Sequence, residues 1–170
     1  GAQLWVAHSV KGGWRLSTFA QPAKKEVQPA TQAFETGSDP LLLTLDGRPS
    51  AIVRDAKSGS LQLIDLTTQE SRFEELGVKS LKGAGACWNP EKKRLGIVTV
   101  EDREKASGVM VLHELIRAEK GWAKAADPIT VGGDKSPGRT SSRPILSRAN
   151  GMYQVHCKGW YEKENQAGLN

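Results

Sequence analysis

The three histidines are the residues whose type and spacing point most directly to chemistry. His8, His113 and His156 each end a short apolar run, as if they occupied one position of a repeat. Imidazole titrates near neutral pH and is the commonest protein ligand for transition metals. Three imidazoles at equivalent positions could converge on a metal ion, or each could serve its own strand as a structural hydrogen-bonding group. We expect the structural role and predict no metal site.

Nucleophilic catalysis needs a thiol or hydroxyl beside a base, and Cys157 directly follows His156. Successive side chains on a strand point to opposite faces, which keeps this pair apart. Cys87 and Cys157 are the two cysteines, too few for the disulfide framework of a small secreted domain, although a single bridge stays open. Residues 83–85 and 132–136 match no P-loop or dinucleotide-binding fingerprint. We therefore expect a protein without catalytic residues or cofactors.

Tryptophan is the enriched aromatic residue, with 5 copies in the chain of 170 residues. Its large ring serves both in packing and as a binding platform. Trp14, Trp122 and Trp160 each follow a glycine directly and are the candidate binding residues. Arg139 and Arg143, from a loose basic group, complete the candidate binding set.

The charge balance bears on the class of partner. A net charge of +5 and a pI near 9.3 are compatible with binding to nucleic acid or another anionic surface. The cations are weakly clustered and are not interleaved with aromatic residues, so we do not expect a nucleic-acid partner. With 38% apolar and 25% charged residues, and no apolar run near the roughly 18 residues of a membrane span, we expect a folded soluble protein. An intracellular location is favoured unless a signal peptide has been removed.

Four short segments share one pattern, a strand-like apolar run that ends in His or Asp. Three of them lead into a Gly-Trp pair, and Phe73 takes the place of Trp in the other. Glycine supplies the positive φ of a tight turn and the aromatic residue begins a return strand, so the pattern predicts a β-hairpin repeated four times. The runs are residues 4–8, 61–65, 109–113 and 152–156, and the Gly-Trp pairs are residues 13–14, 121–122 and 159–160.

Two of these hairpins are preceded by a further pair of predicted strands, residues 41–45 with 50–55 and residues 84–88 with 95–100. A full unit then has four strands over roughly 40 to 50 residues, the length of a propeller blade. We predict an all-β, β-propeller-like single domain with about four repeated antiparallel units, two complete and two partial. The units are approximately residues 1–38, 39–80, 81–132 and 133–170, with loops at 21–38 and 132–142.

Residues 86–98 and 108–112 resemble a blade of the WD-repeat family. In that family an aromatic residue, a small polar residue and proline close the first strand, as Trp88-Asn89-Pro90 do here, and a charged turn follows. Residues 57–68 match again, with Asp65 at the family's Asp position. The family's Gly-His and Trp-Asp pairs are absent, and His replaces Asp in three units. The resemblance implies a rigid propeller scaffold in which the histidines tie strands to neighbouring turns.

The Gly-Trp positions also resemble blades of fungal fucose-binding lectins, in which repeated Trp residues line sugar sites. Those lectins use an Arg and a Glu in each site, whereas the acidic position is here Leu63, Val111 and Gln154. We therefore expect a non-enzymatic scaffold or protein-interaction module, with a carbohydrate-binding lectin as the alternative. A closed ring needs more blades than these residues supply, so we expect a protein partner or self-association to complete it.

Overall fold

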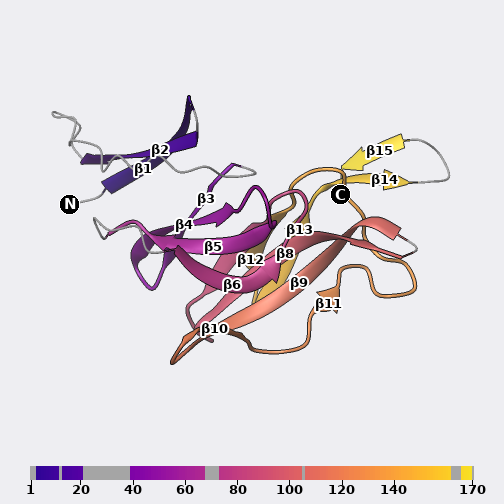
Figure 1. Ribbon diagram of the computed structural model, residues 1–170. Coiled ribbons are helices and arrows are strands. Elements are labelled where there is room, and N and C mark those ends of the chain that lie inside the picture. The colour runs from indigo at the N-terminus through magenta and orange to yellow at the C-terminus, as the bar shows by residue number, and fades with distance from the viewer. Residues whose placement is uncertain are drawn as a thin grey trace.

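Strands alone make up the regular structure of the described residues. The computed structural model describes residues 3–11, 13–20, 39–67, 73–104, 106–161 and 166–169. Every strand pair within these ranges is antiparallel, which confirms the all-β prediction (Figure 1). No helix that could cross a membrane occurs in the described part of the chain. The loop predicted at residues 21–38 lies outside the described residues.

The first four-stranded sheet has its strands in chain order. Its strands are β3 (Leu41–Leu45), β4 (Arg48–Arg54), β5 (Ser60–Asp65) and β6 (Phe73–Lys79). Asp46 and Gly47 join β3 to β4 with φ angles of 49° and 76°, which is the two-residue hairpin turn that an Asp-Gly pair favours. All four strands predicted for this unit are confirmed.

Four of the five strands in the second sheet repeat this arrangement. These strands are β7 (Gly85–Asn89), β8 (Arg94–Arg103), β9 (Ala106–Ala118) and β10 (Gly121–Lys124). The strands predicted at 84–88, at 95–100 and on either side of the Gly121 turn are confirmed. A short fifth strand, β11 (Ile129–Thr130), pairs with Val111 and Leu112 of β9, before the residues that pair with β10. This strand was not predicted from the sequence.

Three hairpins accompany the two larger sheets. Their strands are β1 (Gln3–Val10) with β2 (Gly13–Ala20), β12 (Ile145–Ala149) with β13 (Met152–His156), and β14 (Lys158–Tyr161) with β15 (Gln166–Leu169). The first hairpin is the one that the Gly13-Trp14 pair predicts.

The predicted pairing of residues 152–156 with the strand after Gly159 is wrong. β13 pairs instead with β12, through the two-residue turn Asn150-Gly151 with φ angles of 51° and 77°. Only Cys157 separates β13 from β14, and one residue cannot reverse a strand into a hairpin. The Asn-Gly pair is a stronger local hairpin signal than the repeated apolar run.

The three histidines do not occupy equivalent positions. His8 lies opposite Arg15 of β2, whereas His113 lies beyond the part of β9 that pairs with β10 and is opposite Ile97 of β8. His156 belongs to the second strand of its hairpin. The three strands differ in length and in pairing, so an apolar run that ends in His does not define one repeat position. His113 is buried, while His8 and His156 are exposed.

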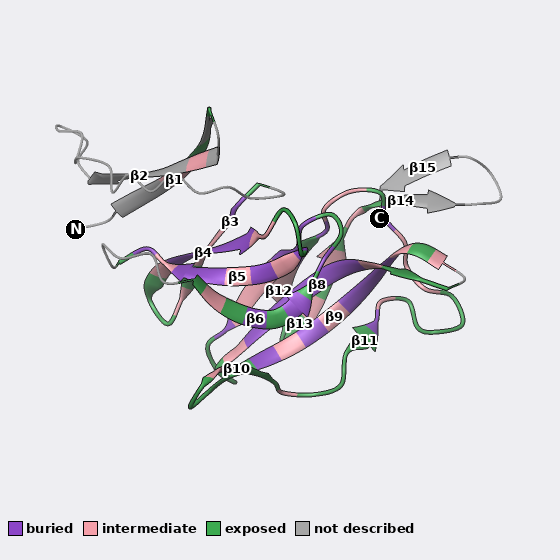
Figure 2. Ribbon diagram, in the orientation of Figure 1, coloured by how far each residue is buried: buried purple, intermediate pink, exposed green. Residues whose placement is uncertain are grey.

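The first and second sheets pack face to face, and most residues of their central strands β4, β5, β8 and β9 are buried or half-buried (Figure 2). An inner cluster between the first and second sheets holds Leu61, Leu76, Leu95 and Ile97, each at most 1% exposed. Burying each such side chain stabilises the fold by about 1.5–3 kcal/mol. The opposite face of the first sheet carries an outer cluster, and the second sheet shares a third cluster with β12 and β13. The outer cluster is Ala51, Val53, Ile64 and Leu66, and the third cluster is Val98, Met110 and Leu146.

Two glycines allow the β12–β13 hairpin to approach the second sheet closely. A Cβ at Gly85 of β7 would lie 2.6 Å from the backbone nitrogen of Leu146, and one at Gly96 of β8 would lie 2.5 Å from the Tyr153 ring. No side chain fits at such distances without a shift of its neighbours. β7 therefore lies between β3 and β12, with contacts to both.

Candidate functional site

A cleft of about 380 Å³ opens at one edge of the two four-stranded sheets. The turn between β3 and β4, the end of β5, the start of β6 and the β9–β10 hairpin all reach this edge, because alternate turns of an antiparallel sheet lie on the same side. The side chains that line the cleft therefore come from both sheets. Those used below are Arg48, Asp65, Glu74, Trp88, Arg117 and Trp122.

Two tryptophans form the aromatic wall of the cleft. The rings of Trp88 and Trp122 meet edge to face, with centroids 6.5 Å apart and an interplanar angle of 89°. Both are partly buried and pack against the inner cluster. Such a contact contributes about 0.5–1.5 kcal/mol beyond the area that it buries. The indole Nε1 of Trp88 is buried without a hydrogen-bond partner among the described residues.

Glu74 connects the two sheets at the mouth of the cleft. Its carboxylate accepts hydrogen bonds from both terminal nitrogens of Arg117, with 3.1 Å between Nη2 and Oε1, and from Trp122 Nε1 at 3.2 Å. The guanidinium of Arg117 also lies 5.2 Å from the centroid of the Trp122 ring. The hydrogen bonds from Arg117 lower the pKa of Glu74, which outweighs the opposing effect of partial burial. Glu74 is therefore ionised at neutral pH and orients both partners.

A second ion pair borders the cleft on the first sheet. Arg48 Nη1 lies 3.7 Å from Asp65 Oδ2, and Asp65 Oδ1 accepts hydrogen bonds from the backbone nitrogen of Thr67 at 2.8 Å and its hydroxyl at 2.6 Å. Partial burial raises the pKa of Asp65, but the bonds from Thr67 and the charge of Arg48 outweigh it, and the net shift is downward. Asp65 fixes the turn that follows β5.

The chemistry of the cleft suits binding. Its described lining residues include no histidine or cysteine. They offer aromatic surface, the three carboxylates of Asp46, Asp65 and Glu74, and two guanidinium groups, all on strand ends and turns. Aromatic surface with a few oriented polar groups is the usual composition of a ligand site.

The structure does not bring the candidate binding residues together. Trp122 lines the cleft, whereas Trp14 packs against the outer cluster on the opposite face of the first sheet. Trp160 belongs to β14, and its side chain lies outside the described residues. Arg139 lines a different cavity, and its backbone forms an isolated antiparallel β-bridge with Val109. Arg143 donates a hydrogen bond to the carbonyl oxygen of Asp39 at 3.0 Å.

Sequence reasoning missed Glu74, Arg117 and Trp88 as site residues. The hairpin at Gly121 places Trp122 directly opposite Arg117, so Arg117 could have been found from the predicted turn. Glu74 is 43 residues from Arg117 in the chain, and only the packing of one sheet on the other brings them together.

The remaining reactive side chains have structural surroundings. His113 Nε2 lies 3.0 Å from Thr99 Oγ1 and 3.4 Å from Glu101 Oε1, and burial lowers the pKa of this histidine. Cys87 and Cys157 are free thiols beside the third cluster, and burial raises the pKa of both. Within the described ranges no group of three or more His, Cys, Asp and Glu residues is placed to hold a metal ion.

Comparison with known proteins supplies no identification. No protein-family model matches the chain. No curated protein matches it either. The function of the cleft must therefore be argued from its own residues.

Proposed function

We propose that this protein is a non-enzymatic interaction module built on a WD-like, propeller-type stack of sheets, and that it holds a protein partner at the inter-sheet cleft. The observation that carries the proposal is the repetition of one layer. Two successive four-stranded antiparallel sheets pack face to face, and their first strands, β3 and β7, lie side by side with β12 next in line. Radial repetition of such sheets is what a propeller requires.

The rigidity of this stack supports a role as a scaffold. The cleft residues sit on strand ends that are held by the inner cluster, so little order has to be gained when a partner binds. Aromatic and arginine side chains such as Trp122 and Arg117 are also the types that contribute most to protein interfaces. Edge strands of the repeated sheets offer backbone groups for a further sheet, from another protein or from a second copy.

Proximity labelling with the intact protein tests this function. We expect a reproducible set of labelled partners, and we expect Arg117→Ala to lose some of them because it removes the guanidinium that spans Glu74 and Trp122. Lys120→Ala is the matched control, since Lys120 is exposed in the neighbouring β9–β10 turn and does not line the cleft. Identical partner sets for Arg117→Ala and the native protein would contradict recognition at the cleft.

Carbohydrate binding is the second candidate, and the surroundings of Trp122 favour it. An aromatic face with a carboxylate and a guanidinium beside it can stack on a sugar ring and hydrogen-bond its hydroxyls, and Trp122, Glu74 and Arg117 form such a group. Titration with a panel of mono- and oligosaccharides should then change tryptophan fluorescence in the native protein, and the affinity should be lower in Trp122→Ala, which removes the stacking surface but keeps Trp88 as a reporter. Absence of any response across the panel would eliminate this alternative.

A further inference from the structure

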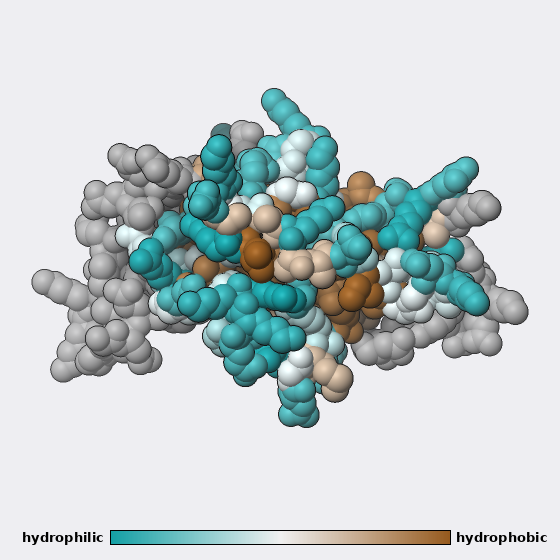
Figure 3. Space-filling view, turned by 90° about the horizontal axis from the view of Figure 1, so that it is seen from below, coloured by the Kyte–Doolittle hydropathy of each residue, from teal (hydrophilic) through white to brown (hydrophobic). Residues whose placement is uncertain are grey.

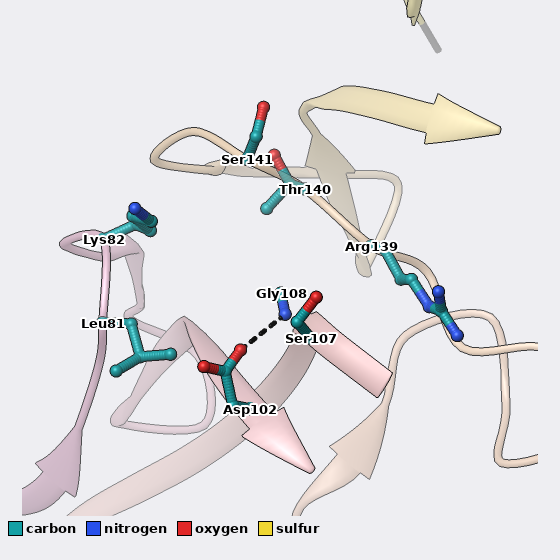
Figure 4. A pocket seen from close by; sticks show the side chains of 8 residues that line it. All are labelled: Leu81, Lys82, Asp102, Ser107, Gly108, Arg139, Thr140 and Ser141. Carbon is teal, nitrogen blue, oxygen red and sulfur yellow. Dashed lines mark hydrogen bonds between the residues drawn. The ribbon is translucent and has the colours of Figure 1, made fainter. Parts of the chain in front are cut away.

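The edge opposite the cleft carries two adjoining hollows, of about 520 and 390 Å³. The first is bordered by the β6–β7 loop, the β8–β9 turn and residues 139–141, and the second by the β4–β5 turn and the end of β6. Leu81 and Asp102 line both hollows. In Figure 4 the Leu81 side chain lies between Lys82 and Asp102, with Thr140 and Ser141 across the first hollow.

Lysines surround Leu81 on this edge. Lys57 and Lys79 line one hollow and Lys82 lines the other, and all three are exposed. Two carboxylates also line the hollows, and each accepts a hydrogen bond from the protein. Asp102 Oδ1 accepts a hydrogen bond from the backbone nitrogen of Gly108 at 2.9 Å, and Glu101 Oε1 accepts one from Thr99 at 3.2 Å. The cations that line the hollows outnumber these two carboxylates, so positive charge dominates the edge; they are Arg54, Lys57, Lys79, Lys82 and Arg139.

The leucine at the centre is held in place by its neighbours. The backbone nitrogen of Leu81 donates to Val100 at 2.8 Å, and that of Ser80 donates to Gly59 at 3.0 Å. The buried hydroxyl of Ser80 donates to the carbonyl oxygen of Gly83 and accepts from the backbone nitrogen of Val100 at 2.9 Å. Leu81 is nevertheless 46% exposed. A fixed apolar side chain between two hollows can anchor a ligand at a low cost in conformational entropy.

We propose that this edge, which we call the basic edge and define as Leu81 with Lys57, Lys79 and Lys82, binds an acidic, leucine-containing peptide segment of a partner protein. The inference rests on the proposed function and adds a second recognition surface to it. Glutamates of the segment pair with the lysines, and its apolar side chains fill the hollows beside Leu81. A single-stranded nucleic acid fits less well, because no aromatic side chain lines either hollow among the described residues and bases would lack a stacking surface.

Fluorescence anisotropy with a labelled synthetic peptide of repeated Glu-Glu-Leu triplets tests the proposal. We expect saturable binding to the native protein and a Kd about tenfold weaker for the double variant Lys79→Glu/Lys82→Glu, because two attractive charges become repulsive. Leu81→Ser should also weaken binding about tenfold by removing the apolar anchor. All three substitutions are at exposed side chains, so the fold should be retained, and a thermal melt verifies it.

The control is a double variant of equal charge, Lys92→Glu/Lys120→Glu, which alters turns at the cleft edge. It should leave the Kd unchanged. Equal weakening by this control would overturn the proposal in favour of non-specific attraction, and so would absence of saturable binding by the native protein below about 1 mM. An oligothymidylate that binds as tightly as the peptide and is insensitive to Leu81→Ser would overturn it in favour of nucleic acid. Arg117→Ala should not affect the peptide, so failure at the cleft and failure at the basic edge are distinguishable.

Discussion

Gly85 begins β7 where the second sheet meets β12, and its replacement by alanine probes how closely these layers pack. A Cβ at this position would lie 2.6 Å from the backbone nitrogen of Leu146, 2.8 Å from the carbonyl oxygen of Pro144 and 3.0 Å from the carbonyl carbon of Ile145. All three atoms belong to the backbone, which cannot rotate away as a flexible side chain can. The substitution must therefore push β12 away from β7.

The expected cost is large for a single methyl group. Overpacking a well-filled site costs about 1–3 kcal/mol, and contact with fixed backbone places Gly85→Ala at the upper end, about 3 kcal/mol. Gly77→Ala is a useful comparison, because Gly77 has a φ of +69° and an added Cβ there meets nothing within 4 Å. Its cost is backbone strain alone, about 1 kcal/mol. Gly85 has no positive φ, so the cost of Gly85→Ala comes from packing, whereas Gly77→Ala measures backbone strain without a packing contribution.

Urea denaturation measures both costs, and thiol reactivity reports which part of the fold has moved. Cys87 and Cys157 lie beside the third cluster, so separation of β12 and β13 from the second sheet should speed their reaction with a disulfide reagent in Gly85→Ala and not in Gly77→Ala. If Gly85→Ala lost no more stability than Gly77→Ala and its thiols reacted at the native rate, the layers would not be stacked as described.

Three further outcomes follow from named contacts. Glu74→Gln should cost less than about 1 kcal/mol at neutral pH, because its ion pair with Arg117 is more than a third exposed. Since the folded state lowers the pKa of Glu74, this contribution is present above the ordinary value of 4.5 and disappears as the pH falls through the folded pKa, so native and variant urea curves should converge on the acid side of 4.5. Ser80→Ala should cost about 1–3 kcal/mol in a thermal melt by leaving buried backbone groups of Gly83 and Val100 without their hydroxyl partner. Asn150→Ala should cost about 1 kcal/mol, because alanine tolerates the φ of +51° in the β12–β13 turn poorly, and an unchanged melting temperature would contradict this turn.

The four-stranded meanders of the two larger sheets could be predicted from the sequence because local residue types specify their turns. Asp46-Gly47 fixes one hairpin, and Asn89-Pro90 with the charged residues after it marks another. The β12–β13 hairpin has an equally local signal in Asn150-Gly151, but a repeat pattern built on His156 and Trp160 led to a different pairing. Short apolar runs are similar in many strands, so turn chemistry determines register better than resemblance between runs does.

The candidate site was less predictable because its residues meet only through tertiary packing. Trp122 was singled out for its residue type, and the structure places it in a cleft. Trp14 has the same local sequence context, yet it covers an apolar face because its hairpin lies against the outer cluster. Glu74 follows Phe73 at the start of β6 and becomes a site residue only when the second sheet brings Arg117 to it. Residue type identified the aromatic group, but the charged partners required the fold.

The antiparallel meander explains why the cleft and the basic edge lie on opposite edges of the same sheets. In a four-stranded meander the turns after the first and third strands reach one edge, and the turn after the second strand reaches the other. Arg117 stands near the turn after β9, and Lys57 lies in the turn after β4. The space between them is filled by the inner cluster, whose packed side chains keep both edges in place. On the face seen in Figure 3, hydrophilic side chains surround several hydrophobic patches. Arg117 and Lys79 share no partner, so adding Arg117→Ala to Lys79→Glu/Lys82→Glu should leave the Kd of the acidic peptide where the double variant alone puts it. A further change in that Kd would mean that the inner cluster couples the two edges.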